Sequence, residues 1–411
     1  MNETPTGLRL QIGVFGRANV GKSSLINWIA GQQVSIVSPI PGTTTDVVAK
    51  PIELLPLGPV TLLDTGGLDD TSALGAARIE RTRRILDRAD VVLLVIEPEV
   101  WTPFEEKMAE EARRRGLPCV PVVNKTDRQP PSAAFLKTLQ ARFGRVVALS
   151  ALETDGRDDR LHALKEAIGR ALKTDSNAPR ALVGDLVPPG GLCVLVVPID
   201  LQAPKGRLIL PQVQVLRDLL DHDAAGLVVN ERQYPALLAR LPAPPALVVG
   251  DSQVIRQVVS DTPTPVPCTT FSILFARFKG DLAELTRGAR AIGQLRDGDR
   301  VLIAEACSHH ALEADIGRVK IPRWLKQHTG VHLKMDVASG RDYPDDLSEY
   351  RLIIHCGGCM LTRREMMNRL SRATRGETPI TNYGVCIAYL QGVLDRVLAP
   401  FERPAETVSA E

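Results

Sequence analysis

The chain has 411 residues, of which 50 are Lys or Arg and 48 are Asp or Glu, so its formal net charge is only +2. This length predicts two or three domains, and the balanced charge argues against a protein whose main task is to cover nucleic acid. No window approaches the roughly 18 apolar residues that a membrane span needs, and the first ten residues lack the layout of a signal peptide. We therefore expect a cytoplasmic protein with no membrane partner.

Residues 8–172 alternate strand-like and helix-like patterns. Strand-like apolar runs lie at 8–16, 59–67, 89–97, 117–127 and 145–151, and helical patterns lie at 22–30, 73–88, 104–115, 132–142 and 158–172. Strands that are buried on both faces and joined through helices indicate a mostly parallel α/β sheet. The segment 47–55 is instead predicted to pair antiparallel with the run that follows it.

Two smaller α/β domains are predicted after this first one. A linker rich in Pro, Gly and Asp covers 173–191, and residues 192–260 show short α/β elements without a catalytic motif, which suits either a module that joins chains or a plain spacer. A second proline-rich joint is expected at 261–270. The remaining elements are a helix over 271–295, a strand at 300–307, a helix at 321–330, a strand at 350–356, a helix at 362–374 and helical structure from 384. The predicted domains are therefore 1–174, 175–262 and 263–411.

The first strand leads into a phosphate-binding pattern. Gly16, Gly21, Lys22 and Ser23 fit G-x-x-x-x-G-K-S/T between a strand and a helix, where backbone N–H groups and the helix N-terminus can hold phosphate. The residues expected to line this loop are Gly16, Asn19, Val20, Gly21, Lys22, Ser23 and Ser24. Lys22 is expected to reach the β- and γ-phosphates, and the Ser23 hydroxyl to bind Mg²⁺. Asp64 in "LLDTGG" can hold the Mg²⁺ through water, and Gly67 can give its N–H to the γ-phosphate.

The stretch "NKTD" at 124–127 predicts recognition of guanine. The carboxylate of Asp127 can accept hydrogen bonds from N1–H and the exocyclic amine of guanine, and adenine offers neither donor there. Asn124 and Lys125 would brace the loop and cover the base, and Ser150, Ala151 and Leu152 would close it from the other side. The sequence therefore predicts a site for GTP and GDP.

These motifs resemble those of the Era and MnmE branch of small P-loop GTPases over residues 8–172. The resemblance implies that "PGTTTD" at 41–46 is the first switch, with Thr44 as a ligand of Mg²⁺. Leu68 stands where Ras-type enzymes have a glutamine that orients water, and a leucine side chain cannot polarise water. Asn19 occupies the position that binds K⁺ in MnmE-like enzymes, although an asparagine there can also be a simple turn residue.

Thiols and imidazoles cluster in the C-terminal third, in the pattern C-x-H followed much later by H-C-x-x-C. Cys307 and His309 would share one side of a strand end, and Gly357 and Gly358 permit a turn that brings Cys356 and Cys359 together. Thr362 can cap the following helix, which would turn its positive end toward the thiolates. His355 would face away from Cys356. Zinc, an iron–sulfur cluster and a redox-active C-x-x-C pair all remain open on these residues. The other four cysteines (Cys119, Cys193, Cys268 and Cys386) are expected in the core.

The order of a GTPase domain, a middle domain and this thiol pattern resembles the HydF family of [FeFe]-hydrogenase maturation GTPases. The stretch "PITNYGVCIAYLQG" at 379–392 is also similar to that family. The resemblance implies a [4Fe-4S] cluster on Cys307, Cys356 and Cys359, with His309 or His355 as a possible further ligand. It also implies a homodimer or higher oligomer, and a scaffold that receives a diiron precursor from radical-SAM maturases and passes it to the apo-[FeFe]-hydrogenase.

An alternative is a GTPase of RNA modification or ribosome assembly that carries a C-terminal zinc module. Its N-terminal domain would look much the same. Against it stand the near-zero net charge and the lack of a basic stretch interleaved with aromatic residues. A nucleic-acid partner is therefore not expected.

Overall fold

The computed structural model describes residues 6–31, 48–64, 75–173, 181–198, 208–306, 315–340, 343–344 and 346–402. The chain divides into two compact units, Met1–Ala178 and Pro179–Glu411. The predicted fold class is confirmed, because mostly parallel α/β sheets build both units.

The N-terminal unit contains a six-stranded sheet in the order β2-β3-β1-β4-β5-β6. Its strands are β1 (Leu10–Phe15), β2 (Val48–Glu53), β3 (Pro59–Asp64), β4 (Val91–Ile96), β5 (Cys119–Val123) and β6 (Val147–Ala148). The β2–β3 pair is antiparallel, as predicted, and the other pairs are parallel. Every residue of β4 is buried, which is what a central strand covered on both faces requires.

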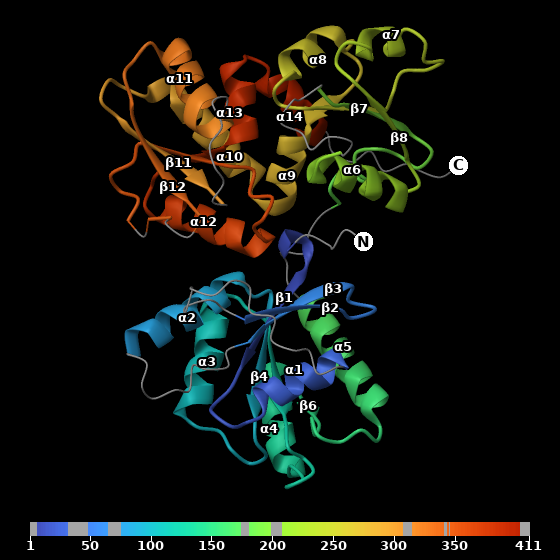
Figure 1. Ribbon diagram of the computed structural model, residues 1–411, viewed down its shortest axis with the longest axis vertical. Coiled ribbons are helices and arrows are strands. Elements are labelled where there is room, and N and C mark those ends of the chain that lie inside the picture. Colours follow the sequence, from blue (N-terminus) through green and yellow to red (C-terminus); the bar gives the residue numbers. More distant parts are fainter. Residues whose placement is uncertain are drawn as a thin grey trace. The chain divides into compact units, whose positions relative to one another are not determined.

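Helices cover both faces of this sheet (Figure 1). On one face α1 (Lys22–Ala30) and α5 (Arg157–Lys173) pack on one hydrophobic cluster, and on the other face α2 (Gly75–Arg88), α3 (Pro103–Arg114) and α4 (Ala133–Phe143) pack on a second. A short 3₁₀ turn (Thr6–Leu8) precedes β1. Local sequence fixes the helix ends: Thr102 and Glu105 form a capping box at α3, and Ser132 caps α4.

The second unit begins with a four-stranded parallel sheet in the order β10-β9-β7-β8. Its strands are β7 (Leu192–Val196), β8 (Ala225–Val229), β9 (Leu247–Gly250) and β10 (Cys268–Thr270), and its helices are α6 (Leu210–Asp221), α7 (Tyr234–Leu238) and α8 (Ile255–Asp261). The prediction of a plain joint over 261–270 is wrong at its end, because β10 pairs there with β9. The last proline is Pro267, so the strand itself keeps all its N–H donors.

A second parallel sheet, in the order β12-β11-β13-β14, follows in the same unit. Its strands are β11 (Arg300–Glu305), β12 (Lys334–Ser339), β13 (Leu352–His355) and β14 (Ile380–Asn382). Around it lie a π-helical turn (Ile316–Lys320), α11 (Ile321–Thr329), α12 (Arg363–Arg375), α13 (Tyr383–Leu390) and α14 (Leu394–Glu402). Sequence reasoning missed β12, whose polar, half-exposed residues hide the strand pattern of an edge position.

The predicted single helix over 271–295 is wrong. The segment forms α9 (Phe271–Lys279), α10 (Leu282–Arg290) and a 3₁₀ turn (Ala291–Gln294). The break comes at Gly280, which is extended, and the Asp281 side chain then caps α10 by accepting the N–H of Glu284.

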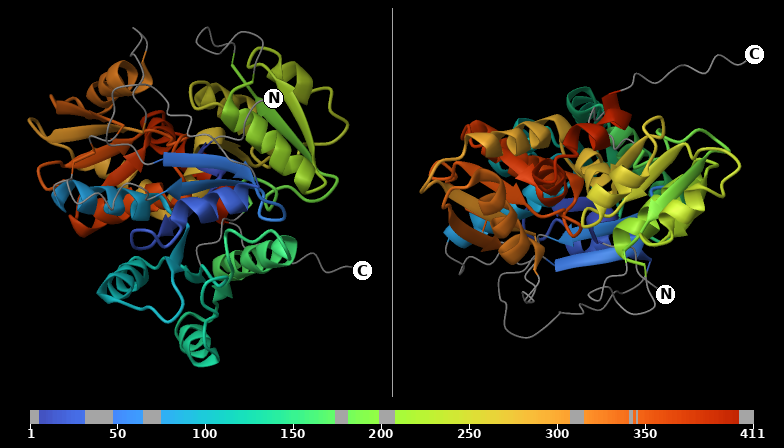
Figure 2. Two further views of the ribbon diagram at one scale, coloured as in Figure 1. Left: turned by 60° about the horizontal axis from the view of Figure 1, so that its bottom comes forward. Right: turned by 90° about the horizontal axis from the view of Figure 1, so that it is seen from above.

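One hydrophobic cluster joins the two sheets of this unit, since Val194 and Val248 belong to it together with Leu302 and Ile353. Figure 2 shows the green-to-yellow and orange-to-red parts side by side. The predicted boundary near 262 therefore falls inside a continuous core.

The close contact between α10 and β14 yields a stability test. A Cβ added at Gly288 would overlap the carbonyl group of Ile380. We expect Gly288→Ala to lower the free energy of unfolding by about 1–3 kcal/mol through overpacking. The matched helical control is Gly169→Ala in α5, where a Cβ would make an ordinary contact with Leu57, and which should stabilise by about 0.5–1 kcal/mol. Urea denaturation followed by circular dichroism measures both; equal behaviour would contradict the packing argument.

Candidate functional sites: a phosphate loop and a thiol turn

The phosphate loop spans residues 16–21, between the end of β1 and the start of α1. Gly21 has a φ of 93°, and a Cβ there would overlap the side-chain amide of Asn124, so the position suits only glycine. Asn19 has a φ of 63° and is exposed. The loop therefore has the left-handed turns that let successive N–H groups converge.

Lys22 lies buried at the first position of α1. Its Nζ donates to the carbonyl oxygens of Gly16 (2.9 Å) and Arg17 (2.8 Å), which holds the ammonium over the loop. Ser23 and Ser24 follow it and are exposed.

Asp64 ends β3 and is buried, in register with Val14 of β1. The predicted phosphate and magnesium residues of this strand end and of the helix start thus share one edge of the sheet. Thr44 and Gly67, and Leu68 with them, lie outside the described residues.

A single buried amide links the phosphate loop to the predicted base site. The Nδ2 of Asn124 donates to the carbonyl oxygen of Val20 (2.9 Å), and its Oδ1 accepts the N–H of Ala151 (3.0 Å). The loop that contains Ser150 and Leu152 is therefore fixed by the residue that opens "NKTD". The predicted residues of both loops come together here.

Asp127 is exposed, and the Ser150 hydroxyl beside it lowers the pKa of its carboxyl group. The carboxylate is thus ionised and available to accept hydrogen bonds from a base. Sequence reasoning missed Glu97, which pairs with Lys125 (2.6 Å) and with Arg17 of the phosphate loop (3.6 Å). Its position directly after β4, at the same sheet edge, was a usable signal.

The thiol turn, Cys356–Cys359, follows β13 directly. Gly358 has a φ of 59°, and the turn leaves Cys356 half-buried and Cys359 exposed. The Sγ of Cys356 accepts the N–H of Ala306 (3.1 Å) and the N–H of Gly358 (3.4 Å). The predicted cap is confirmed: Thr362 and Glu365 form a capping box at the start of α12.

Cys307 and His309 lie outside the described residues. Among the residues that the structure does describe, no group of three or more His, Cys, Asp or Glu side chains could hold a metal ion. The described end of β11 carries the buried Glu305, which accepts hydrogen bonds from Arg318 (2.7 Å) and Ser339 (3.0 Å).

Both ring nitrogens of His355 have hydrogen-bond partners within the protein. Its Nδ1 lies 2.7 Å from the carbonyl oxygen of Cys356, and its Nε2 lies 2.9 Å from the guanidinium of Arg369. Because Arg369 can only donate, Nδ1 must carry the proton. Burial and the charge of Arg369 lower the pKa of His355 to about 4. This arrangement disfavours the prediction of His355 as a cluster ligand.

Three of the four remaining cysteines lie buried in the core, as predicted. Cys193, Cys268 and Cys386 are buried, and Cys119 is half-buried and packs against a hydrophobic cluster of the N-terminal unit. Burial raises the pKa of Cys193 and of Cys386 to about 12, so both stay protonated and inert.

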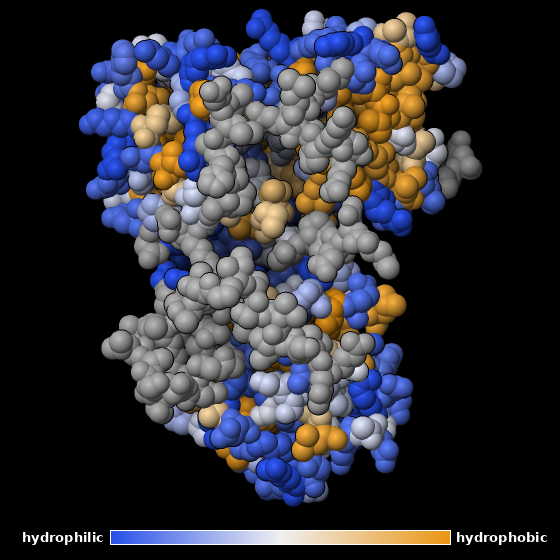
Figure 3. Space-filling view, in the orientation of Figure 1, coloured by the Kyte–Doolittle hydropathy of each residue, from blue (hydrophilic) through white to orange (hydrophobic). Residues whose placement is uncertain are grey.

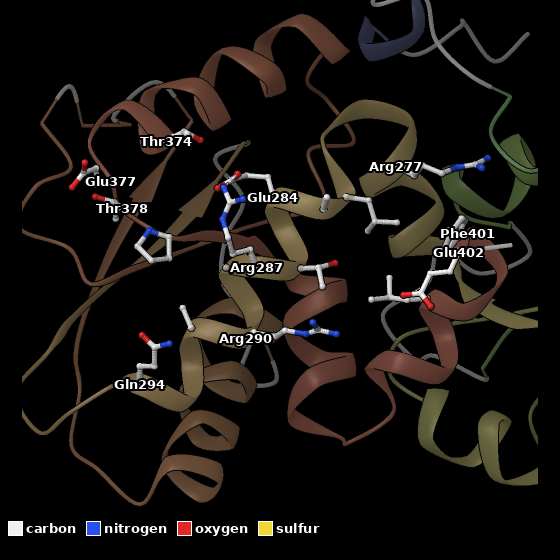
Figure 4. A pocket seen from close by; sticks show the side chains of 17 residues that line it. Arg277, Glu284, Arg287, Arg290, Gln294, Thr374, Glu377, Thr378, Phe401 and Glu402 are labelled. Atoms are coloured by element: carbon white, nitrogen blue, oxygen red, sulfur yellow. Dashed lines mark hydrogen bonds and ion pairs between the residues drawn. The ribbon is translucent and has the colours of Figure 1, made fainter. Parts of the chain in front are cut away.

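The second unit also has an open cavity of about 840 Å³ between α10 and α14 (Figure 4). The arginines in its wall are paired with carboxylates, as Arg287 is with Glu284, Arg290 with Asp395 and Arg277 with Asp185. Their charge is largely compensated, so the cavity does not have the character of an anion site.

Among the described residues, no helix is long and apolar enough to cross a membrane.

The N-terminal unit matches known GTPases. A family model described as "50S ribosome-binding GTPase" matches residues 11–125. The tRNA modification GTPase MnmE of a Synechococcus species is 42% identical over 127 residues, which cover 30% of this chain and 26% of that protein. GTPase Der of Agrobacterium fabrum is 35% identical over 161 residues, which cover 38% of this chain and 34% of that protein. The chain thus spans about a quarter to a third of the length of these curated relatives.

Among solved structures, an Era variant of Aquifex aeolicus is 21% identical, with 56% of this chain and 97% of that chain covered and a TM-score of 0.32. The phosphate loop, "NKTD" and the family match together define the N-terminal unit as a P-loop GTPase domain.

The second unit matches two further family models. The "Hydrogen maturase F dimerization domain" matches residues 182–280, and the "Hydrogen maturase F tetramerization domain" matches residues 283–400. Together they cover more than half of the chain. The chain belongs to the hydrogen maturase F family, and the resemblance expected from the sequence is confirmed.

Proposed function

We propose that this protein is a GTP-hydrolysing scaffold that binds a [4Fe-4S] cluster and delivers a diiron precursor to apo-[FeFe]-hydrogenase. The observation that carries the proposal is the thiol turn. Its Cys356 sulfur accepts an N–H from Ala306, and Ala306 is joined to Cys307 by one peptide bond. The chain thus offers a route by which two distant segments supply thiolates to one centre.

The residues around the thiol turn suit an iron–sulfur cluster. N–H groups that point at sulfur stabilise thiolates and tune cluster potentials, and Cys356 already accepts two of them. Cys307, Cys356 and Cys359 would hold the cluster, and His309 is the candidate for a fourth ligand. Three thiolates would bind three of the four irons of the cluster, and the fourth iron would then carry an exchangeable ligand. Such a corner suits a carrier, and the diiron precursor is its cargo.

The nucleotide site would act through its own geometry. Lys22 and the loop N–H groups would hold the phosphates, while Ser23, Thr44 and Asp64 would hold Mg²⁺ and Gly67 would donate its N–H to the γ-phosphate. Asp127 would select guanine, with Asn124, Lys125 and the loop of Ser150, Ala151 and Leu152 around the base. Asn19 is exposed on the loop, where its amide oxygen could bind K⁺ and supply the charge that an arginine finger gives elsewhere.

An exposed apolar surface supports self-association. Val213, Leu220 and Val228 are 48%, 63% and 41% exposed on α6 and on β8, the edge strand of its sheet. In Figure 3 apolar surface gathers where Figure 1 places α6 and β8. Within the described residues β8 has a strand neighbour on one side only, and an apolar sheet edge beside an apolar helix favours a second copy as its cover. The names of both matched domains support an oligomer, of which we propose the dimer contact to be this surface.

The proposed partners are the radical-SAM maturases that make the diiron precursor and the hydrogenase that receives it. The proposed compartment is the cytoplasm, where free thiols such as those of the described cysteines persist. GTP hydrolysis would bias partner docking and release rather than make bonds in the cluster.

Hydrolysis kinetics test the nucleotide site. We expect the purified protein to hydrolyse GTP but not ATP, and faster in potassium chloride than in sodium chloride. Lys22→Ala should lower the rate by about two orders of magnitude, since it removes charge-assisted hydrogen bonds of about 1.5–3 kcal/mol each. Asn19→Ala should abolish the difference between the two salts. Equal rates of the unaltered protein in both salts would leave Asn19 as a turn residue only.

Iron analysis tests the cluster. Anaerobically purified protein should be brown and show an EPR signal on reduction. Cys356→Ser, Cys359→Ser and Cys307→Ser should each lose most of the iron, because a hydroxyl is a far poorer ligand for iron than a thiolate. Cys119→Ser, outside the turn, serves as the control and should keep it. Colourless protein loaded with zinc would contradict the scaffold and favour the GTPase with a zinc module.

Light scattering tests the dimer surface. Leu220→Glu places a charge in the proposed contact, and a twofold interface uses each residue twice. Since a buried leucine contributes about 1.5–3 kcal/mol, the dissociation constant should rise at least about tenfold. Leu55→Glu, at a leucine that is 68% exposed in the N-terminal unit, is the control. If both variants keep the mass of the unaltered protein, the contact lies elsewhere.

A further inference from the structure

We propose that Lys279 is a positioning residue of the thiol turn, which it holds in shape and beneath which it places a positive charge. The proposal rests on the proposed cluster function and deepens it. Lys279 ends α9, outside the sequence pattern that predicts the thiol site, and its exposed fraction is only 2%.

The ammonium group of Lys279 is saturated by the turn. Its Nζ donates to the carbonyl oxygens of Gly358 (3.1 Å), Cys359 (3.0 Å) and Leu361 (2.8 Å). An ammonium has three protons, and these three acceptors use all of them. The long side chain of Lys279 thus places one buried positive charge next to the backbone of residues 358–361.

These acceptors fix the direction of the Cys359 side chain. The carbonyl of Gly358 belongs to the peptide plane before Cys359, and the carbonyl of Cys359 belongs to the plane after it. Holding both planes sets the two backbone dihedrals of Cys359 and therefore the direction of its Cβ. A lysine that lies 80 positions earlier in the chain thus orients the Cα–Cβ bond that carries the exposed thiol.

A second cation, Arg363 at the start of α12, stabilises the same contact between the thiol turn and the end of α9. A guanidinium nitrogen of Arg363 donates to the carbonyl oxygens of Phe278 (2.7 Å) and Gly280 (3.2 Å), the two neighbours of Lys279. The end of α9 and the turn thus hold each other by crossed hydrogen bonds. A loop with two consecutive glycines would otherwise have many conformations to lose on binding metal.

The charge gives Lys279 a role beyond packing. Reduction of a cluster adds negative charge, and net charge nearby is one of the factors that set its potential. A buried cation stabilises the reduced form, so its removal should lower the reduction potential. A merely structural lysine would leave the potential unchanged in any variant that binds the cluster.

The experiment uses the full chain with Lys279→Met, Lys279→Gln and Lys279→Arg, and Lys326→Met as the control on an exposed lysine of α11. Gln keeps two donors without the charge, so it carries the test if the Met variant fails to fold. In the metal-free protein, hydrogen exchange by mass spectrometry should show faster exchange over residues 355–362 in Met and Gln than in the unaltered chain. Arg and the Lys326 control should stay close to it.

After anaerobic reconstitution with iron and sulfide, the Gln variant should show a lower reduction potential by EPR-monitored titration. The Arg variant should stay near that of the unaltered protein. Unchanged exchange and an unchanged potential in Gln would overturn the proposal, and so would a lowered potential in Arg equal to that in Gln. If the unaltered protein binds no cluster, the proposed function falls, while the exchange comparison still decides whether Lys279 holds the turn.

Discussion

The hydrogen bond from the N–H of Ala306 to the Cys356 sulfur is the contact on which the candidate metal site depends. It exists because β11 and β13 are parallel neighbours in the register that pairs Ala304 with His355. Parallel neighbours end at the same sheet edge, so the residues that follow them meet although they are 50 positions apart. A shift of one residue in that register would turn Cys356 to the other face.

The same rule builds the nucleotide site in the N-terminal unit. The phosphate loop follows β1, Asp64 ends β3, Asn124 follows β5 and Ser150 follows β6, all at the carboxyl ends of the parallel strands of one sheet. Asn124 converts this shared edge into a single site, since its amide bonds the phosphate loop and the loop of Ser150 at once. Each unit thus carries its polar residues where strands end and keeps its apolar residues in between.

The sequence predicted most strands and helices because buried parallel strands read as long apolar runs, as in β4. The sequence-based prediction failed where the local residue pattern does not reflect the role of a segment in the folded protein. The short β10 follows prolines, β12 is polar because it is an edge, and the break at Gly280 interrupts an apolar periodicity that continues on both sides. The thiol pattern gave Cys356 and Cys359 by spacing alone. No spacing could give Lys279, because its contact with the turn arises only when α9 packs against α12.

The charge around the thiol turn explains why these surroundings suit a redox-active group. Lys279 and Arg369 are buried or half-buried, and within the described part of the chain their hydrogen bonds go to carbonyl oxygens and to His355 rather than to a carboxylate. Burial lowers the pKa of Lys279 to about 8, and the nearby Cys359 and Glu365 offset part of this effect.

Zinc and an oxidised [4Fe-4S] cluster, each with three thiolates, both carry a single net negative charge and would offset part of that effect equally. One-electron reduction doubles the net negative charge of the cluster, whereas the zinc site cannot be reduced in this way. His355, kept neutral with a pKa of about 4, adds no third cation that would overcompensate. Lys279 and Arg369, with the Glu365 carboxylate near both, would stabilise thiolates in either kind of site, and the proposed cluster would gain more from the two cations when it is reduced.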